Sequence, residues 1–290
     1  LSIGHCRIEG VMSDVPVVLL EERALNNGLV LAMATLNNER ALNSLSLDMI
    51  NLLLPAMQRW ASDERVVAVF LQGAGEKAFC AGGDVRRICT GVRENGIDDP
   101  YAQQFFTEEY KLDFLIHSFP KPVIVWGQGI VMGGGIGLMC GASHRVVTET
   151  SRLAMPEITI GLYPDVGGSH FLSRLPGRLG LFLGMTGVSL NAGDALFAGF
   201  ADYAVASDRR QAVLASLTSL EWSADTMEHK NQVSMVLQAE QCPDLPVSEL
   251  QPRIAQINER AAADDLPTLH AVLTAPAADD VWMDRTARTL

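Results

Sequence analysis

Apolar and polar positions along the first quarter of the chain predict strands that flank one amphipathic helix. Residues 17–20 and 29–36 are rich in aliphatic side chains and indicate two neighbouring strands. After Ser46, a favoured N-cap residue, apolar side chains recur at helical spacing as far as Trp60. A continuous apolar run at 66–71 then predicts a short buried strand.

The next part of the chain alternates between short apolar runs and segments rich in small residues. Residues 73–83 are expected to form a loop, and 127–137 carry six glycines. Helices are predicted from Val85 onward, over 103–117 and after the glycine run, and strands over 122–126, 145–148 and 153–155. The recurring order of strand, strand and helix indicates a mixed α/β fold.

Strand signals nearly end at about residue 207. Helices are predicted over 210–220, around 235–239, over 250–263 and over 281–290. We therefore divide the chain into a core, residues 1–207, and a helical C-terminal region, residues 208–290.

The charge of the chain narrows the choice of partners. The 290 residues carry a formal net charge of −12, and 48% of them are hydrophobic. An acidic surface repels phosphate backbones and anionic lipids, so we expect neither nucleic acid nor a membrane as a partner. A small anionic ligand remains possible where helix N-termini gather.

The cysteines give no sign of a metal site or of a disulfide framework. There are five, an odd number, and none forms a C-x-x-C pair or a zinc-binding spacing with the six histidines. We expect reduced, mostly buried thiols in a cytosol-like compartment, and no bound metal.

Two glycine clusters are the strongest candidates for chemistry. Ala81-Gly82-Gly83-Asp84 ends the first loop, and Gly133-Gly134-Gly135 opens a helix. Glycine lets backbone N–H groups approach a ligand closely, and two such donors aimed at one point form an oxyanion hole. Tight helix–strand packing without a ligand explains the glycines equally well. The G-x-G-x-x-G spacing of a dinucleotide site fails, because Met132 and Leu138 stand where the third glycine would be.

Two carboxylates, Glu157 and Asp165, lie eight residues apart in a stretch that is otherwise apolar and rich in proline and glycine. Apolar surroundings raise the pKa of a carboxyl group toward neutrality, which suits acid–base work. Taken singly, each is more easily explained as a loop carboxylate bonded to backbone amides. His170, beside Ser169, is expected to be structural or at the rim of a site. Arg86 and Arg87 either meet phosphates or are solvated helix charges.

Together these motifs resemble the crotonase (enoyl-CoA hydratase/isomerase) superfamily. The resemblance rests on residues 77–85, 132–137 and 155–157, in this order and spacing. Residues 79–84, 106–110 and 164–168 are more finely similar to the 3-hydroxyisobutyryl-CoA hydrolase branch. The likeness is strong over about residues 15–205 and loose beyond.

The resemblance implies a fold, a spiral of ββα turns followed by helices, and an activity, the hydrolysis of an acyl-CoA thioester. It also implies that the helical region 208–290 is incomplete, because members of the hydrolase branch usually continue for several more helices. The expected substrate is 3-hydroxyisobutyryl-CoA, with CoA as part of the substrate and no other cofactor. By the same resemblance, Gly83 and Gly134 are the oxyanion donors, Glu157 is the catalytic glutamate, Asp165 is the second carboxylate and Glu109 contacts the substrate. Whether Glu157 attacks the carbonyl or activates water stays open.

One departure bears on the reaction type. The hydratases carry a second catalytic glutamate three residues after the middle glycine, where this chain has Gly137. The first alternative is nevertheless a lyase or isomerase on the same scaffold, and the second is a CoA-binding protein without catalysis. We expect a cytoplasmic protein, or a mitochondrial matrix protein in a eukaryote, for which a homo-oligomer is a possible assembly.

Overall fold

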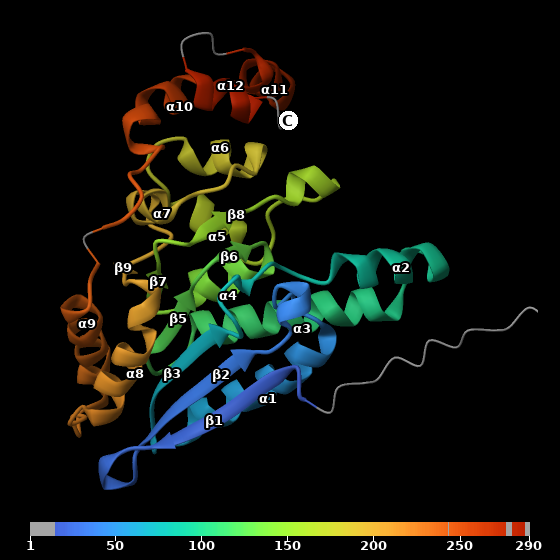
Figure 1. Ribbon diagram of the computed structural model, residues 1–290. Helices are drawn as coiled ribbons and strands as arrows, with labels where there is room; N and C mark the ends of the chain where they lie inside the picture. Colours follow the sequence, from blue (N-terminus) through green and yellow to red (C-terminus); the bar gives the residue numbers. More distant parts are fainter. Residues whose placement is uncertain (1–14, 243, 277–279, 288–290) are drawn as a thin grey trace, which may run out of the picture.

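The computed structural model describes residues 15–242, 244–276 and 280–287, which form alternating strands and helices (Figure 1). The strands are β1 (Val18–Ala24), β2 (Val30–Leu36), β3 (Val66–Gly73), β4 (Ala78–Cys80), β5 (Val123–Gly127), β6 (Ile130–Met132), β7 (His144–Val147), β8 (Arg152–Ala154) and β9 (Tyr203–Ala204). The α-helices are α1 (Leu47–Ser62), α2 (Val85–Asn95), α3 (Pro100–His117), α4 (Gly134–Gly141), α5 (Gly168–Leu172), α6 (Leu179–Thr186), α7 (Ala192–Ala198), α8 (Arg210–Ser219), α9 (His229–Ala239), α10 (Ile254–Arg260), α11 (Leu266–Thr274) and α12 (Val281–Ala287).

Two sheets organise the molecule. The larger one has the order β1-β2-β3-β5-β7-β9 and the smaller one the order β4-β6-β8. The β1–β2 pair is antiparallel, and the other pairs are parallel. The chain therefore visits one strand of each sheet and then a helix, as in β5-β6-α4, before it returns to the larger sheet. This confirms the predicted spiral of ββα turns.

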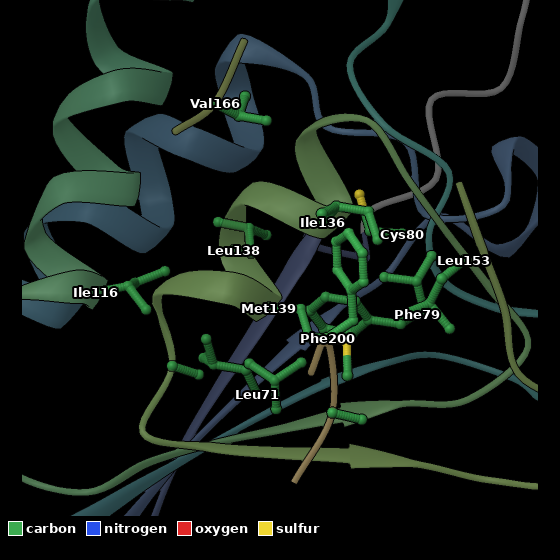
Figure 2. Close-up of a cluster of buried hydrophobic side chains, with 14 of the residues drawn as sticks. Leu71, Phe79, Cys80, Ile116, Ile136, Leu138, Met139, Leu153, Val166 and Phe200 are labelled. Atoms are coloured by element: carbon green, nitrogen blue, oxygen red, sulfur yellow. The ribbon is translucent and has the colours of Figure 1, made fainter. Parts of the chain in front are cut away.

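Both faces of the larger sheet are buried at its inner strands, whereas the edge strand β1 is largely exposed. In β5, Val123 and Val125 belong to the main core, while Ile124 and Trp126 point to a second cluster on the opposite face. Helices α8 and α9 supply Leu217 and other apolar side chains to that second cluster. Figure 2 shows part of the main core, where side chains of α4 meet those of β4 and β8. The predicted boundary at residue 207 stays a prediction.

Local signals position the helices that surround the site. The Ser46 hydroxyl accepts a hydrogen bond from Met49 N at 3.2 Å, which confirms the predicted cap of α1. Asp84 caps α2 by accepting from Arg87 N, and Asp99 caps α3 by accepting from Ala102 N. These caps satisfy N–H groups that a helix start leaves unpaired.

The structure corrects several sequence predictions. The expected loop 73–83 contains β4, and the glycine run contains β6 and already begins α4 at Gly134. Partners in the smaller sheet stabilise these three-residue strands, whose sequences are too short to show a period. Helices α5, α6, α7 and α11 are additional to those that the patterns predict. Of the helix predicted over 281–290, α12 covers Val281–Ala287, and residues 288–290 lie outside the described part.

The expectation of mostly buried thiols is wrong. The four described cysteines are free, but only Cys80 is buried; Cys89 is exposed, and Cys140 and Cys242 are intermediate. Burial raises the pKa of the Cys80 thiol to about 12, which makes it an unreactive core residue. Cys6 lies outside the described residues.

Candidate active site

A cavity of about 630 Å³ lies where α2, α3, the two glycine clusters and residues 156–166 meet. We call it the main cavity. Its inner end contains Glu109 and Val166, which are almost fully buried, and its mouth contains Val92 and Ile97, which are exposed. It is further lined by Ala81, Gly82, Gly83, Val85, Ile88, Cys89, Ala102, Gln103, Phe105, Phe106, Gly133, Gly134, Pro156, Glu157, Thr159, Ile160, Leu162 and Asp165.

The N–H group of Gly83 has no partner in the isolated parallel bridge that Gly83 forms with Leu45. Leu45 N donates to Gly82 O at 2.8 Å, and Asp84 N donates to Leu45 O at 2.8 Å. In this pattern both groups of Leu45 bond the neighbours of Gly83, whose own N–H points away from Leu45. No backbone hydrogen bond of the described residues uses the Gly83 N–H.

The N–H group of Gly134 lacks a backbone hydrogen-bond partner for a different reason. Gly134 is the first residue of α4, and the first N–H groups of a helix have no partner within it. Gly133 turns the chain into the helix with φ +51°, a conformation that favours glycine. The two clusters lie side by side, because a Cβ on Gly82 would stand 3.6 Å from Gly134 N.

Glu157 lies beside these glycines at the start of a 3₁₀ turn, Glu157–Ile160. It is buried, and its Oε2 atom has no hydrogen-bond partner among the described residues. A Cβ on Gly133 would stand 3.1 Å from Glu157 Oε1. Burial, and secondarily the nearby Asp165, raises the pKa of Glu157 to about 7. The carboxyl group can therefore work as an acid, a base or a nucleophile near neutral pH.

Glu109 projects from α3 between the two glycines. The position of a Cβ on Gly134 lies 2.4 Å from Glu109 Oε1, and that of a Cβ on Gly83 lies 4.0 Å from the same atom. Both backbone donors therefore border the space next to Glu109. Burial, followed by the charges of Asp165 and Glu157, raises the pKa of Glu109 to about 8.

Asp165 completes the group from the loop that follows the 3₁₀ turn of Glu157. It is half-buried, and its Oδ2 atom accepts a 2.7 Å hydrogen bond from the Tyr110 hydroxyl. Since Tyr110 follows Glu109 on α3, this bond ties the loop of Asp165 to the helix that carries Glu109. The tertiary structure thus brings all five predicted site residues to one cavity: Gly83, Glu109, Gly134, Glu157 and Asp165.

Sequence reasoning missed two polar residues of this region, Tyr110 and Asp113. Both carboxylate oxygens of Asp113 are buried without a hydrogen-bond partner among the described residues. Burial, followed by the charges of Glu109 and Asp165, raises the pKa of Asp113 well above its usual range. The available signal was spacing, because Asp113 lies four residues after Glu109 and so shares its helix face.

The remaining candidates lie outside the main cavity. His170 is exposed, and its ring meets that of His117 with a centroid distance of 5.2 Å, which fits the predicted rim position. Arg86 and Arg87 are exposed, and the Arg87 guanidinium carbon lies 4.6 Å from the centroid of the Tyr101 ring. No group of three His, Cys, Asp or Glu side chains in the described ranges could hold a metal ion. Within the same ranges, no helix is long and apolar enough to cross a membrane.

Residues 31–290 match the family model described as enoyl-CoA hydratase/isomerase. The chain belongs to this family. Among curated relatives, it is 47% identical over 175 residues to the mitochondrial 3-hydroxyisobutyryl-CoA hydrolase of Xenopus tropicalis, covering 60% of this chain and 45% of that protein. It is 40% identical over 207 residues to the human protein of the same name, covering 71% of this chain and 52% of that one. The chain thus spans about half the length of the curated relatives it matches.

Two solved structures show that the fold is shared with known enzymes. A carnitinyl-CoA dehydratase from Mycobacterium thermoresistibile is 34% identical with a TM-score of 0.81, covering 94% of this chain and 74% of that chain. An enoyl-CoA hydratase from Rhodobacter sphaeroides is 35% identical with a TM-score of 0.77 and the same coverage.

Proposed function

We propose that this chain carries the active site of an acyl-CoA thioester hydrolase and that its substrate is 3-hydroxyisobutyryl-CoA. The names of the curated relatives support the substrate. The observation that carries the proposal is the position of Glu157, a buried carboxyl group with one unpartnered oxygen, beside the free N–H groups of Gly83 and Gly134.

In the proposed reaction the thioester oxygen accepts hydrogen bonds from Gly83 N–H and Gly134 N–H. These fixed donors stabilise the negative charge that develops when the carbonyl carbon is attacked. Glu157 either attacks this carbon itself, which expels the CoA thiolate and leaves an acyl anhydride, or removes a proton from an attacking water. If Glu157 activates water, that water supplies the second oxygen of the product acid. On the anhydride route, water attacks the carboxyl carbon of Glu157, so in the first turnover the acid leaves with an oxygen from Glu157 and the water oxygen stays in Glu157. On both routes the thiolate takes up a proton from the water and leaves as the thiol.

Asp165 and Glu109 are proposed to contact the acyl group. Tyr110 occupies one oxygen of Asp165, which leaves the other to accept a hydrogen bond from the 3-hydroxyl group. Glu109, with its raised pKa, is largely protonated near neutral pH and so can donate a hydrogen bond to the substrate. No cofactor is proposed besides the CoA of the substrate.

A thiol-release assay across a panel of acyl-CoA esters tests this proposal. We expect 3-hydroxyisobutyryl-CoA to be hydrolysed fastest, and an absence of thiol release from every ester would contradict it. The rival is hydration, which the names of the two solved structures suggest. Hydration in the family uses two glutamates, and Gly137 supplies no second one. Hydration is followed as the loss of the conjugated enoyl absorbance of crotonyl-CoA. If it ran as fast as the hydrolysis of 3-hydroxyisobutyryl-CoA, hydration would replace hydrolysis as the favoured function.

The role of Glu157 has its own tests. A single turnover in H₂¹⁸O places label in Glu157 if the carboxylate attacks, and none there if it activates water. Either role needs the ionised form, so we expect kcat/KM to rise about tenfold per pH unit below about 7 and then to level off. A profile that is flat between about pH 5.5 and 8 would remove Glu157 from both roles.

The compartment and the assembly also belong to the proposal. The curated relatives are named mitochondrial, which supports a matrix location if the host is a eukaryote, and a cytoplasmic one otherwise. A homo-oligomer stays a prediction that sedimentation of the full protein tests.

A further inference from the structure

Val166, the residue after Asp165, has an unusual backbone. Its φ is +41°, and a β-branched residue at positive φ carries steric strain. The side chain is 5% exposed and lies at the margin of the main core, apart from the other labelled side chains in Figure 2. The surrounding packing therefore holds Val166 in a conformation that it would not adopt by itself.

Val166 separates two cavities. It lines the inner end of the main cavity, and it also lines a second cavity of about 360 Å³ on its other side. The second cavity is bounded by α3, α4 and α5, and its walls include Phe114, Cys140 and Phe171. Asp113 also lines it, but both carboxylate oxygens of that residue are covered. Tyr110, His117 and His170 line it as well, but most of the exposed lining is apolar, so the cavity suits a hydrocarbon chain better than a charged group.

Gly137 explains why Val166 can fill this place. A Cβ on Gly137 would lie 2.6 Å from Val166 Cβ and 3.1 Å from Asp113 Oδ1. The Val166 side chain thus occupies the space in front of Gly137. It forms the wall between the two cavities, at a position that a side chain on residue 137 of α4 would otherwise fill. Even one methyl group on Gly137 forces Val166 to shift while the valine is present.

The burial of the main cavity gives the direction of the substrate. The mouth is exposed, with room for the large CoA portion to extend into solvent. The inner end is closed by Glu109 and Val166, so the acyl group points toward Val166 once the thioester oxygen lies on Gly83 and Gly134. An acyl chain that grows beyond the short branched substrate meets the Val166 side chain.

We propose that Val166 sets the acyl-chain length of this site, and that the second cavity would accept longer acyl chains if the valine were removed. The inference rests on the acyl-CoA binding part of the proposed function. It makes Val166 a specificity-determining residue and Gly137 its structural partner.

Binding of non-hydrolysable 2-oxoalkyl-CoA thioethers, from 2-oxobutyl (the butyl thioether) to 2-oxooctyl (the octyl thioether), tests this without catalysis, because the ketone oxygen still accepts from Gly83 and Gly134 and there is no thioester bond to cleave. Val166→Gly adopts the +41° φ freely and opens the partition. We expect the octyl-to-butyl affinity ratio to rise at least roughly tenfold over wild type, since extra methylenes in an apolar pocket discriminate by this order. Val166→Ala serves as a second variant with a less flexible backbone, and we expect a smaller rise in the same direction.

The double variant Val166→Gly/Gly137→Ala is the matched control. The methyl group on residue 137 then occupies the vacated space, so we expect the affinity ratio to fall back toward that of wild type. A folded Val166→Gly protein with the wild-type ratio would overturn the inference. So would a wild-type protein that already binds the octyl thioether more tightly than the butyl one.

Thiol release by the wild-type protein is measured in parallel. If no ester is hydrolysed but the thioether ratio changes as expected, the hydrolase proposal fails and the chain-length inference stands. If esters are hydrolysed but the affinity ratio is unchanged, the hydrolase proposal stands and the chain-length inference fails.

Discussion

The inner end and the mouth of the main cavity differ in residue type and in exposure to solvent. At the inner end, Glu109 and Val166 are 2% and 5% exposed, and the carboxyl groups of Glu157 and Asp165 lie close by. At the mouth, Val92 and Ile97 are apolar and are 37% and 87% exposed. Burying carboxyl groups costs stability and changes their pKa, whereas exposed apolar groups have little effect on either. This contrast agrees with the proposal that the chemistry occurs at the inner end and that the CoA portion extends through the mouth.

The largest expected effect is at Glu157. Glu157→Gln keeps the size of the side chain but removes the nucleophile or base, so we expect kcat to fall by at least ~100-fold in thiol release. Glu108→Gln is the control, because Glu108 forms an ion pair with Lys111 on α3 outside the cavity. Full activity of a folded Glu157→Gln protein would show that the buried carboxyl is not part of the chemistry.

A nearly equal loss is expected at Gly134. Gly134→Val retains the N–H but places a branched side chain at a position only 2.4 Å from Glu109 Oε1. Loss of one oxyanion donor costs roughly 2.7–4 kcal/mol of barrier in other enzymes, so we expect turnover per folded molecule to fall ~100-fold or more.

Gly141→Ala, near the other end of α4, is the control for helix packing. A Cβ there lies 3.2 Å from His117 N and from Ile116 Cγ2, so we expect a lower Tm with turnover preserved. If Gly134→Val also lowered Tm alone, its glycine would serve packing and not the oxyanion.

A smaller effect, on stability, is expected at Glu109. Its pKa is raised from 4.5 to about 8, so the folded protein binds this proton more tightly than the unfolded chain does. The stability that this proton provides is present at low pH and is lost as the pH rises toward 8. Glu109→Gln cannot ionise, so we expect its Tm to exceed that of wild type by a few degrees at about pH 8.5 and by less at about pH 5.

Thermal unfolding at both pH values checks this, with the exposed Glu64→Gln as control. The same Tm difference at the low and the high pH would mean that Glu109 does not titrate as its burial implies.

The smallest expected effect is at the mouth. Ile97→Ser changes an exposed side chain, and such surface changes alter free energies by about 0.5 kcal/mol at most. We expect KM for the acyl-CoA ester to rise by less than about threefold and kcat to stay the same. A kcat loss comparable to that of Glu157→Gln would remove the distinction between the two ends.

The sequence by itself determined the elements that local patterns encode. Helix α1 begins after its cap at Ser46, and β2, β3 and β5 of the larger sheet are apolar runs long enough to recognise, whereas the two-residue β9 of the same sheet is not. The same holds for the residue types of the site, because glycine clusters and a carboxylate among apolar residues have a chemical meaning before any fold is known. The family resemblance added their order and spacing.

Only the tertiary structure decided what depends on distant parts of the chain. Strands β4 and β6 exist because each pairs with the other in the smaller sheet, and Asp165 is bonded to Tyr110, 55 residues away. The partition at Val166 needs Gly137 on a separate helix. Local sequence fixes backbone preference and side-chain type, whereas burial, pKa and the walls between cavities depend on which segments the fold packs together.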